Sequence, residues 1–365
     1  MKNILLILVG GTICTSINES GHLTVSKEAG ILLKDNYLKS DSPYADKVKI
    51  DTTKNLYVLS ENMTVKKWNE IIKTYRKYVS RKKYDGVILA HGTDTLAYSA
   101  SIFSILFSAS EIPVFFVSAN ENLKSDKTNG NDNFRCAVEC ICRGIIPNVY
   151  VPYKNISDGR MYIHLGSRLE QCRNYSEDFH SVGEFDVSDM TEDNYQKYLV
   201  QLEKRYPVDK RKAIVDILGE WNLKDCVLFL TPYVGLNYSA YRYNSFDAVL
   251  HGSFHSGTAC AQKGEKTSRY DRFSVLYMLD KCFKAKKNID VYFFPAELKG
   301  GTYETVSVIG NHVVNGKSIR FLNGYTYEMA YAKLVIAYSL FAKEEERHRF
   351  IYDEINYEVI SEAKS

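Results

Sequence analysis

The stretch YDGVILAHGTDTLAYSASIF, residues 84–103, contains the most informative junction in the chain. The run GVILAH is continuously apolar, which is typical of a β-strand covered on both faces of a parallel sheet. The run TLAYSASIFSILF that follows it has the length and composition of an apolar helix. Between them lie Thr93, Asp94 and Thr95. Because ligands of open α/β sheets gather outside the carboxyl ends of the strands, this junction predicts a binding site.

The same alternation of strands and helices extends along most of the chain. The runs NILLILVG, NLYVLSENM, IPVFFVSAN and NVYVPY predict strands, separated by amphipathic helices such as VKKWNEIIKTYRKYVSRK. This is the βαβ rhythm of a parallel sheet with helices on both faces, and it resumes from Asp225 after a polar stretch. We therefore predict an α/β protein with a larger N-terminal parallel-sheet domain at residues 1–200, a helical linker or insertion at 201–222, and a smaller C-terminal α/β domain with a charged tail at 223–365.

The composition excludes several functional classes. With 365 residues, 45% of them hydrophobic, the chain can bury a core, and its formal charge of +3 gives no electrostatic reason to expect nucleic-acid binding. No apolar run is long enough to span a membrane, and MKNILLILVGG reads as a first buried strand because no cleavage site follows it. The eight scattered cysteines lack the paired spacing of a zinc site and fit a reducing cytoplasm. We therefore expect a cytoplasmic protein without a metal or another cofactor.

Small, hydroxyl, amide or acidic side chains end four of the expected strands. These ends are GGT at 10–12, SEN at 60–62, HGTDT at 91–95 and SAN at 118–120. Each alone is typical of a turn or a helix cap, but together at one sheet edge they indicate a site. A threonine after two glycines is open to a ligand and can act as a nucleophile, while N–H groups at a helix start can bind an oxyanion or a carboxylate. The chain has neither a P-loop nor a G-x-G-x-x-G pattern, so nucleotide binding is disfavoured.

These motifs resemble a known family. The blocks LVGGTI, LSENMT and LAHGTDTLAYSAS are similar to the signature blocks of bacterial-type L-asparaginases, which are asparaginase/glutaminase amidohydrolases. Weaker similarity appears at FDAVLHGSFHSGTA and ELKGG, so the resemblance covers most of the chain outside about 180–222 and the tail. It implies a two-domain asparaginase-like α/β fold and a homodimer or homotetramer whose active sites form between subunits. It also implies a small-molecule amide substrate and the release of ammonia.

The resemblance implies a role for each matching residue. Thr12 would be the nucleophile that attacks the side-chain amide, and Thr93 would belong to a second triad with Asp94 and a lysine. Ser60 and Glu61 would hold the α-carboxylate and amino groups of the substrate, and Asp94 would also bind the α-amino group. We expect the substrate-binding residues to be Gly11, Ser60, Glu61, Gly92 and Ala119.

The sequence departs from the family pattern at several of these positions. In HLGSRLEQCRNYS the position of the family lysine falls on Gln171, which cannot transfer a proton but could orient a water or Thr93. His22 stands where the family has a tyrosine, and a histidine could serve as a base near neutral pH. Glu61 and Thr258 also replace commoner residues. We expect the catalytic residues to be Thr12, Thr93, Asp94, Gln171 and His22.

Three hypotheses about function follow. The first is an amidohydrolase that uses Thr12 on an asparagine- or glutamine-like amide, with an altered substrate preference such as a modified or peptide-linked amino acid. The second is a catalytically degenerate asparaginase-like protein that binds such a ligand or regulates another protein. The third is an amidase subunit that hands ammonia to a partner.

Overall fold

The computed structural model describes residues 1–17, 20, 22–26, 28–54, 56–189, 191–262, 270–295 and 303–360. The ELKGG block lies outside the described residues. The chain forms two compact units. Unit 1 contains Met1–Trp221 and Glu354–Glu358, and unit 2 contains Asn222–Asp353 and Val359–Ser365. The return of residues 354–358 to unit 1 was not expected from the sequence.

Unit 1 is built on a seven-stranded sheet with the order β11-β8-β7-β6-β5-β1-β4. Its strands are β1 (Lys2–Leu8), β4 (Val48–Thr52), β5 (Gly86–Ala90), β6 (Val114–Val117), β7 (Val149–Lys154), β8 (Met161–Leu165) and β11 (Phe185–Asp186). The five strands β4, β1, β5, β6 and β7 are parallel, while β8 and β11 extend one edge through two antiparallel pairings, β7 with β8 and β8 with β11. The predicted α/β fold is confirmed, and the sheet is mixed where the sequence indicated only parallel pairing.

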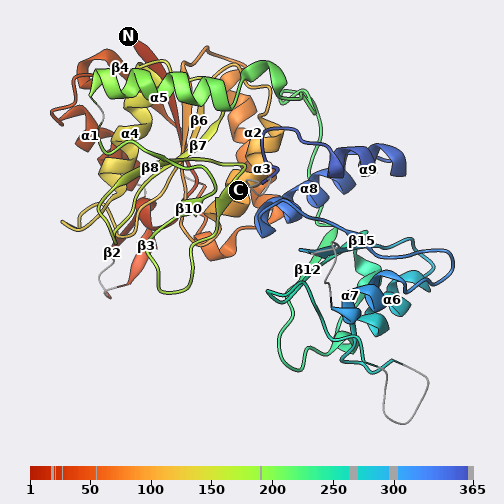
Figure 1. Cartoon of the computed structure of the whole chain (residues 1–365). Helices are drawn as coiled ribbons and strands as arrows, with labels where there is room; N and C mark the ends of the chain where they lie inside the picture. The colour runs from red at the N-terminus through yellow and green to blue at the C-terminus, as the bar shows by residue number, and fades with distance from the viewer. Residues whose placement is uncertain are drawn as a thin grey trace. The chain divides into compact units, whose positions relative to one another are not determined.

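Helices cover both faces of this sheet (Figure 1). Helices α1 (Ala29–Leu38) and α4 (Gly130–Cys142) pack together on one face, where α5 (Glu192–Arg205) joins the same core. Helices α2 (Val65–Val79) and α3 (Leu96–Leu106) lie on the other. Coverage on both sides explains why the strands are continuously apolar rather than alternating.

Local signals in the sequence set the ends of these helices. The Thr64 side chain accepts a hydrogen bond from the Lys67 N–H at 3.3 Å and so caps α2. Helix α4 ends before Gly144, whose φ of 78° lies in the left-handed region, and the Ile145 N–H then bonds back to the Cys140 carbonyl at 3.0 Å.

The segment that leads to Ser60 differs from the expected strand. The strand beside β1 is β4, and the following chain contributes a single parallel bridge between Gly10 and Val58. Its Leu56 and Val58 N–H groups bond to the carbonyls of Leu8 and Val9, so the segment still runs along β1 to the same sheet edge. The residues at that edge therefore reach it through an extended connection rather than a regular strand.

Short elements complete unit 1. A hairpin of β2 (Thr15–Ile17) and β3 (Leu23–Val25) follows the 3-10 turn η1 (Thr12–Cys14). A second antiparallel pair joins β9 (Leu169–Glu170) and β10 (His180–Ser181). The other 3-10 turns described in this unit are η2 (Ala45–Lys47), η3 (Ser60–Asn62) and η4 (Val208–Lys210).

The returning segment 354–358 is held by buried polar contacts. Asn356 is fully buried and donates from its amide to the Ser104 carbonyl and to the Asn148 side chain, both at 2.8 Å. The buried Glu358 carboxylate accepts the N–H groups of Ile355 and Asn356. Buried polar groups need hydrogen-bond partners, so the segment is specified by sequence even though it looks like a charged tail.

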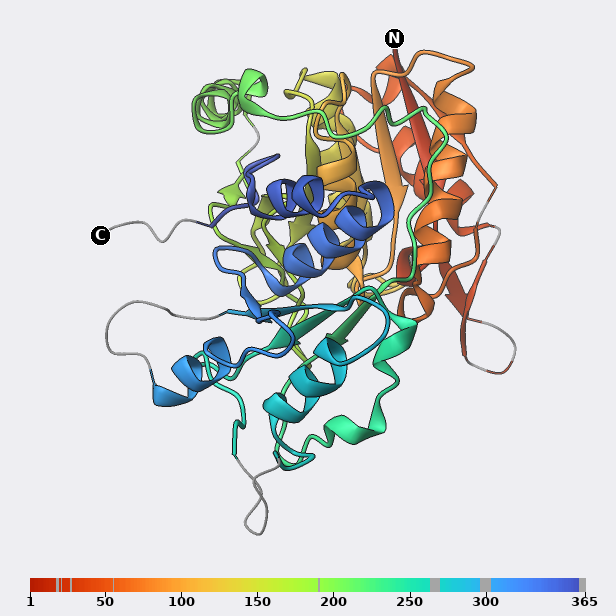
Figure 2. The ribbon, with the colours of Figure 1, turned by 90° about the vertical axis from the view of Figure 1, so that its right-hand side faces the viewer.

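Unit 2 has a four-stranded parallel sheet with the order β12-β13-β14-β15. Its strands are β12 (Val227–Leu230), β13 (Ala248–Gly252), β14 (Asp290–Phe294) and β15 (Arg320–Phe321). Helices α6 (Val275–Phe283) and α7 (Glu304–Gly310) lie on one face and α8 (Tyr327–Leu340) on the other, with α9 (Glu344–Tyr352) beside α8 (Figure 2). The turns η5 (Tyr238–Ala240) and η6 (Tyr243–Ser245) precede β13.

Candidate functional site

Backbone contacts join three of the predicted strand ends. Gly11 has a φ of 75°, and a Cβ placed on it would lie 2.0 Å from the Gly92 Cα. A Cβ on Gly92 would lie 2.5 Å from the Ser60 Cβ. Only glycine fits at both positions, because any side chain would collide with its neighbour. The two glycines therefore let residues 10–12, 60 and 91–95 approach one another at the carboxyl edge of the sheet.

Ser60 locks this junction to the start of α3. Its hydroxyl oxygen accepts the Thr95 N–H at 3.1 Å, and the Thr95 hydroxyl donates to the Ser60 carbonyl at 3.0 Å. Ser60 is buried, with 5% of its surface exposed. The side chain predicted to bind substrate thus has a clear structural role in holding the HGTDT segment in place.

Thr12 begins the turn η1 directly after the two glycines. Its carbonyl accepts the Thr15 hydroxyl at 2.8 Å, and the Cys14 N–H bonds to the Gly11 carbonyl at 2.8 Å. The Thr12 side chain is half-buried, and its hydroxyl makes no hydrogen bond to any residue that the structure describes. A nucleophile must be exposed to its substrate and free to lose its proton, so this hydroxyl is suited to that role.

A cavity of about 580 Å³ opens beside the start of α3. It is lined by Thr93, Asp94, Tyr153, Gln171, Cys172, Arg173, Asn174, Tyr175, Ser176, Glu177 and Phe179. Three predicted catalytic residues, Thr93, Asp94 and Gln171, therefore share one cavity. The lining does not include the other predicted residues, which are Gly11, Thr12, His22, Ser60, Glu61, Gly92 and Ala119.

These other residues lie in different settings. Gly11, Ser60 and Gly92 form the junction described above, whereas Ala119 is fully buried just after β6. Glu61 is exposed in η3, and His22 is exposed between the strands of the β2–β3 hairpin. Their roles toward a substrate remain predictions.

Gln171 bridges two backbone groups at the start of α3. Its Nε2 donates to the Thr93 carbonyl at 2.8 Å, and its Oε1 accepts the Ala97 N–H at 3.2 Å. The first N–H groups of a helix have no partner within the helix, so the amide satisfies one of them. A lysine could donate to the Thr93 carbonyl but could not accept from Ala97. The replacement of the family lysine thus exchanges a charge for a neutral bridge.

His91 is a site residue that the sequence analysis did not select. It is fully buried, with its Nδ1 2.8 Å from the Gly92 carbonyl and its Nε2 2.9 Å from the Ser99 hydroxyl. Since a carbonyl only accepts, Nδ1 carries the proton and Nε2 accepts from Ser99, whose oxygen in turn accepts the Trp68 indole N–H at 2.9 Å. Burial lowers the pKa of His91 to about 4, so the ring stays neutral and positions Gly92. Its position within the HGTDT motif is the sequence feature that could have identified it as a site residue.

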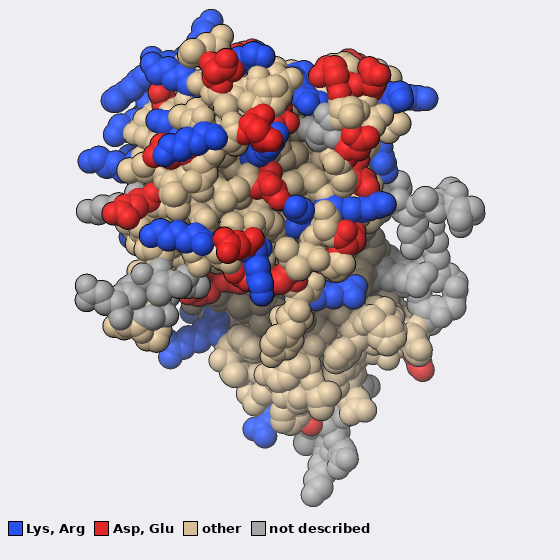
Figure 3. All heavy atoms as spheres, turned by 90° about the vertical axis from the view of Figure 1, so that its left-hand side faces the viewer, with Lys and Arg blue, Asp and Glu red and all other residues tan. Residues whose placement is uncertain are grey.

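The described part of the structure gives little support for other kinds of functional site. Among the described residues, no group of three or more His, Cys, Asp or Glu side chains is arranged to hold a metal ion. No described helix is long and apolar enough to cross a membrane, and none of the eight cysteines forms a disulfide. On the face shown in Figure 3, basic and acidic side chains are interspersed.

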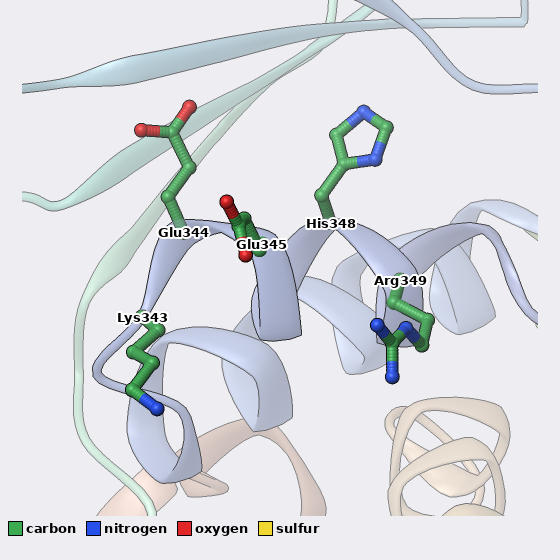
Figure 4. A pocket seen from close by; sticks show the side chains of 5 residues that line it. All are labelled: Lys343, Glu344, Glu345, His348 and Arg349. Carbon is green, nitrogen blue, oxygen red and sulfur yellow. The ribbon is translucent and has the colours of Figure 1, made fainter.

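A larger cavity, of about 840 Å³, lies along α9 in unit 2. Its lining residues lie at the start of this helix and along it, and are Lys343, Glu344, Glu345, His348 and Arg349. Glu344 and His348 point to one side and Lys343 and Arg349 to the other, so these groups do not converge (Figure 4). The cavity at the start of α3 is therefore the better candidate site.

The fold is that of an α/β protein with a mostly parallel sheet, and the candidate cavity lies beside the start of α3, the helix that follows β5. A family profile described as "Asparaginase, N-terminal" matches residues 3–201. The chain belongs to the asparaginase family.

Individual relatives are distant. A glutamyl-tRNA(Gln) amidotransferase component from Methanococcus maripaludis is 23% identical over 337 residues, which cover 90% of this chain and 78% of that protein. The relative of the same name from Halobacterium salinarum is 26% identical over 185 residues, which cover 50% of this chain and 42% of the relative. Several curated relatives are thus matched over only about half of their length.

Solved structures give the same fold. The thermostable L-asparaginase of Thermococcus kodakarensis superposes with a TM-score of 0.67 at 20% identity, covering 99% of this chain and 100% of that chain. L-asparaginase I of Vibrio cholerae gives a TM-score of 0.64 at 18% identity, covering 98% and 99%. At these identities the matches establish the fold, and the expected two-domain asparaginase-like architecture is confirmed.

Proposed function

We propose that this protein is an amidohydrolase that cleaves the side-chain amide of an asparagine- or glutamine-like substrate and releases ammonia. The observation that carries the proposal is the half-buried Thr12 hydroxyl, which is unbonded among the described residues and directly follows Gly11, the glycine packed against Gly92 of the HGTDT segment. A hydroxyl in this setting is suited to acyl transfer. Relatives named as amidotransferase components and asparaginases support an amide as the reacting group.

The proposed reaction has two steps. The Thr12 oxygen attacks the amide carbon, its proton passes to His22, and the C–N bond breaks so that ammonia leaves with that proton. A water then attacks the resulting ester, which restores the Thr12 hydroxyl and releases the carboxylic acid. Asp94 holds the amino group of the substrate through opposite charge, and Thr93 orients the water at the cavity wall.

Purified protein incubated with asparagine, glutamine and their peptide-linked forms tests this proposal. Ammonia release from at least one of these amides is expected, together with the matching aspartate or glutamate product. If no amide in the series releases ammonia, the proposed activity is wrong.

A second candidate function, ligand binding without turnover, is favoured by the Gln171 bridge. If proton transfer at this position limits the rate, Gln171→Lys should raise ammonia release about 100-fold, since positioned general acids and bases contribute roughly 10²–10⁴-fold. Gln196→Lys is a matched control on the exposed face of α5 and should leave the rate unchanged.

The result separates the two functions. A protein that binds without turnover would show an asparagine- or glutamine-dependent rise in Tm and no ammonia release. Turnover that appears only with Gln171→Lys would assign the missing proton transfer to this position. Any clear turnover by the unaltered protein would exclude that candidate.

The family also suggests an assembly, and we propose a cytoplasmic homodimer or homotetramer. Light scattering of the purified full chain should give two or four times the chain mass of 41.8 kDa. A monomer at all concentrations that support activity would contradict this prediction.

A further inference from the structure

One loop forms most of the wall of the cavity at the start of α3. It comprises residues 171–179, between β9 and β10, and all of its residues except Asp178 line the cavity. The remaining lining residues are Thr93, Asp94 and Tyr153. The conformation of this loop therefore decides which substrate the cavity can hold.

The first end of the loop is fixed to the start of α3. The Gln171 amide bonds to the Thr93 carbonyl and the Ala97 N–H, as described above. Just before it, Glu170 pairs with His180 in the small antiparallel sheet at the base of the loop. These contacts tie the loop to the segment that carries two of the predicted catalytic residues.

The last end is fixed to the turn after β7. Asn155, with 1% of its surface exposed, accepts the Phe179 N–H and donates to the Phe179 carbonyl, both at 3.0 Å. The Asp178 carboxylate accepts the N–H groups of Ile156 and Ser157 at 2.7 and 3.2 Å. A buried amide with both of its groups paired to one residue holds that residue in place, so this end is also specified by the fold.

The middle of the loop has no such contacts. The Ser176 N–H bonds to the Arg173 carbonyl at 3.0 Å, and the Asp178 N–H bonds to the Ser176 hydroxyl at 3.2 Å. No hydrogen bond, ion pair or ring contact joins residues 173–176 to any described residue outside the loop. These four residues can therefore change conformation without breaking a bond to the rest of unit 1.

Tyr175 lies within this unattached part and has two unusual features. Its φ of 62° is in the left-handed region, which is strained for a bulky side chain, and such strain is concentrated at functional sites. The residue is also fully exposed, at 107%, although it lines the cavity. A tyrosine ring contributes to binding when it is buried against a ligand. Movement of the ring over a ligand would both bury it and allow its φ to return to a negative value.

We propose that residues 173–176 form a strap that closes over the bound substrate, and that the Tyr175 ring covers the aliphatic part of an asparagine or glutamine side chain. The inference rests on the proposed function, which puts the amino group of the substrate at Asp94 in this cavity. The closed ring adds affinity through its apolar face and excludes water from the acyl transfer. Because the face of the ring makes the contact, the phenol hydroxyl is not required.

Tyr175→Gly separates a binding role from a structural one. Glycine adopts a positive φ without strain, so the Tm of the unliganded protein should stay about the same. Asparagine and glutamine are titrated calorimetrically into the full chain carrying Thr12→Ala, which prevents turnover. Adding Tyr175→Gly should weaken binding about tenfold, whereas Tyr175→Phe keeps the apolar ring and should bind within about twofold of the parent.

Asn315→Gly is the matched control. Asn315 has a φ of 54° in a turn of unit 2, and relief of the strain there should leave ligand affinity unchanged. Unchanged affinity in Tyr175→Gly overturns the strap. A Tm that falls together with the affinity also overturns it, since Tyr175 would then support the unliganded fold.

Trypsin cleavage after Arg173 measures the closure itself, because this residue is exposed in the strap. Saturating asparagine or glutamine should slow this cleavage about tenfold in the Thr12→Ala protein, and Tyr175→Gly should remove the protection. Cleavage after Arg242, which is exposed in unit 2, gives the reference rate and should not respond to ligand. Cleavage after Arg173 at one rate with and without bound ligand would contradict the closure.

These outcomes are distinguishable from failure of the proposed function. If the ligand protects Arg173 but no amide releases ammonia, the hydrolase assignment fails and the strap stands. If ammonia is released while cleavage does not respond to ligand and affinity does not respond to Tyr175→Gly, the hydrolase assignment stands and the strap fails. If neither asparagine nor glutamine binds and no ammonia is released, both are wrong.

Discussion

Thr12→Ala is expected to lower the rate of ammonia release by about 10⁴-fold or more, because alanine lacks the oxygen that forms the ester intermediate. The fold should persist, since the contacts that shape the turn η1 come from the backbone. The Thr12 carbonyl still accepts the Thr15 hydroxyl, and Gly11 still lies against Gly92. The measurement is kcat/KM for the best amide of the substrate series, with Tm recorded in parallel to show that the variant is folded.

Two further variants sharpen this test. Thr12→Ser keeps a hydroxyl at the same position and should retain measurable turnover. Thr24→Ala makes the same chemical change on the exposed strand β3 of the adjacent hairpin and should leave the rate unchanged. Full activity in Thr12→Ala would show that another group carries the reaction, and the assignment of Thr12 would be wrong.

The fold could be predicted where the sequence pattern depends on burial alone. GVILAH at β5 and NILLILVG at β1 are continuously apolar because helices cover both faces of the sheet, so they read correctly as strands. The elements beside the ends of these strands were harder to predict. Residues 56–62 have strand-like composition but pair with β1 only locally, because β4 already occupies the register from Val48 to Thr52. Such a choice between two neighbouring segments depends on tertiary pairing, which composition does not encode.

The candidate site was predictable to a similar degree. The motif HGTDT and the lysine position indicated Thr93, Asp94 and Gln171, and these residues line one cavity. Tyr153 and Glu177 were not predicted, since a tyrosine in an apolar strand and a glutamate in a polar loop are ordinary at the sequence level. Both line the same cavity, and only the folding of β7 and of the loop after β9 brings them there.

His91 also links the site to the stability of unit 1. Burial lowers its pKa to about 4 and that of the fully buried His164 to about 3, against an ordinary value near 6.5. Between the lowered and ordinary values the unfolded chain binds protons that the folded chain does not, so the free energy of unfolding rises with pH across this window. The stability that each neutral, buried histidine contributes is fully present above about pH 6.5 and is lost as pH falls. The change is about 1.4 kcal/mol per pH unit for each histidine, so each lowers the free energy of unfolding by about 3 kcal/mol between pH 6.5 and pH 4.

We therefore expect unit 1 to lose roughly 6 kcal/mol of stability between pH 7 and pH 4, a large share of the stability of a typical domain. Both tryptophans, Trp68 and Trp221, belong to unit 1, so denaturant unfolding followed by tryptophan fluorescence reports on this unit.

His91→Gln should reduce the slope of the free energy of unfolding against pH by up to about 1.4 kcal/mol per pH unit, even though it also weakens the fold at pH 7. His255→Gln, at an exposed ring in unit 2, should leave the slope intact. Because His91 bonds to Gly92, a slope that does not respond to His91→Gln would mean that this ring is protonated within the folded site, and the neutral Gly92 contact described above would be wrong.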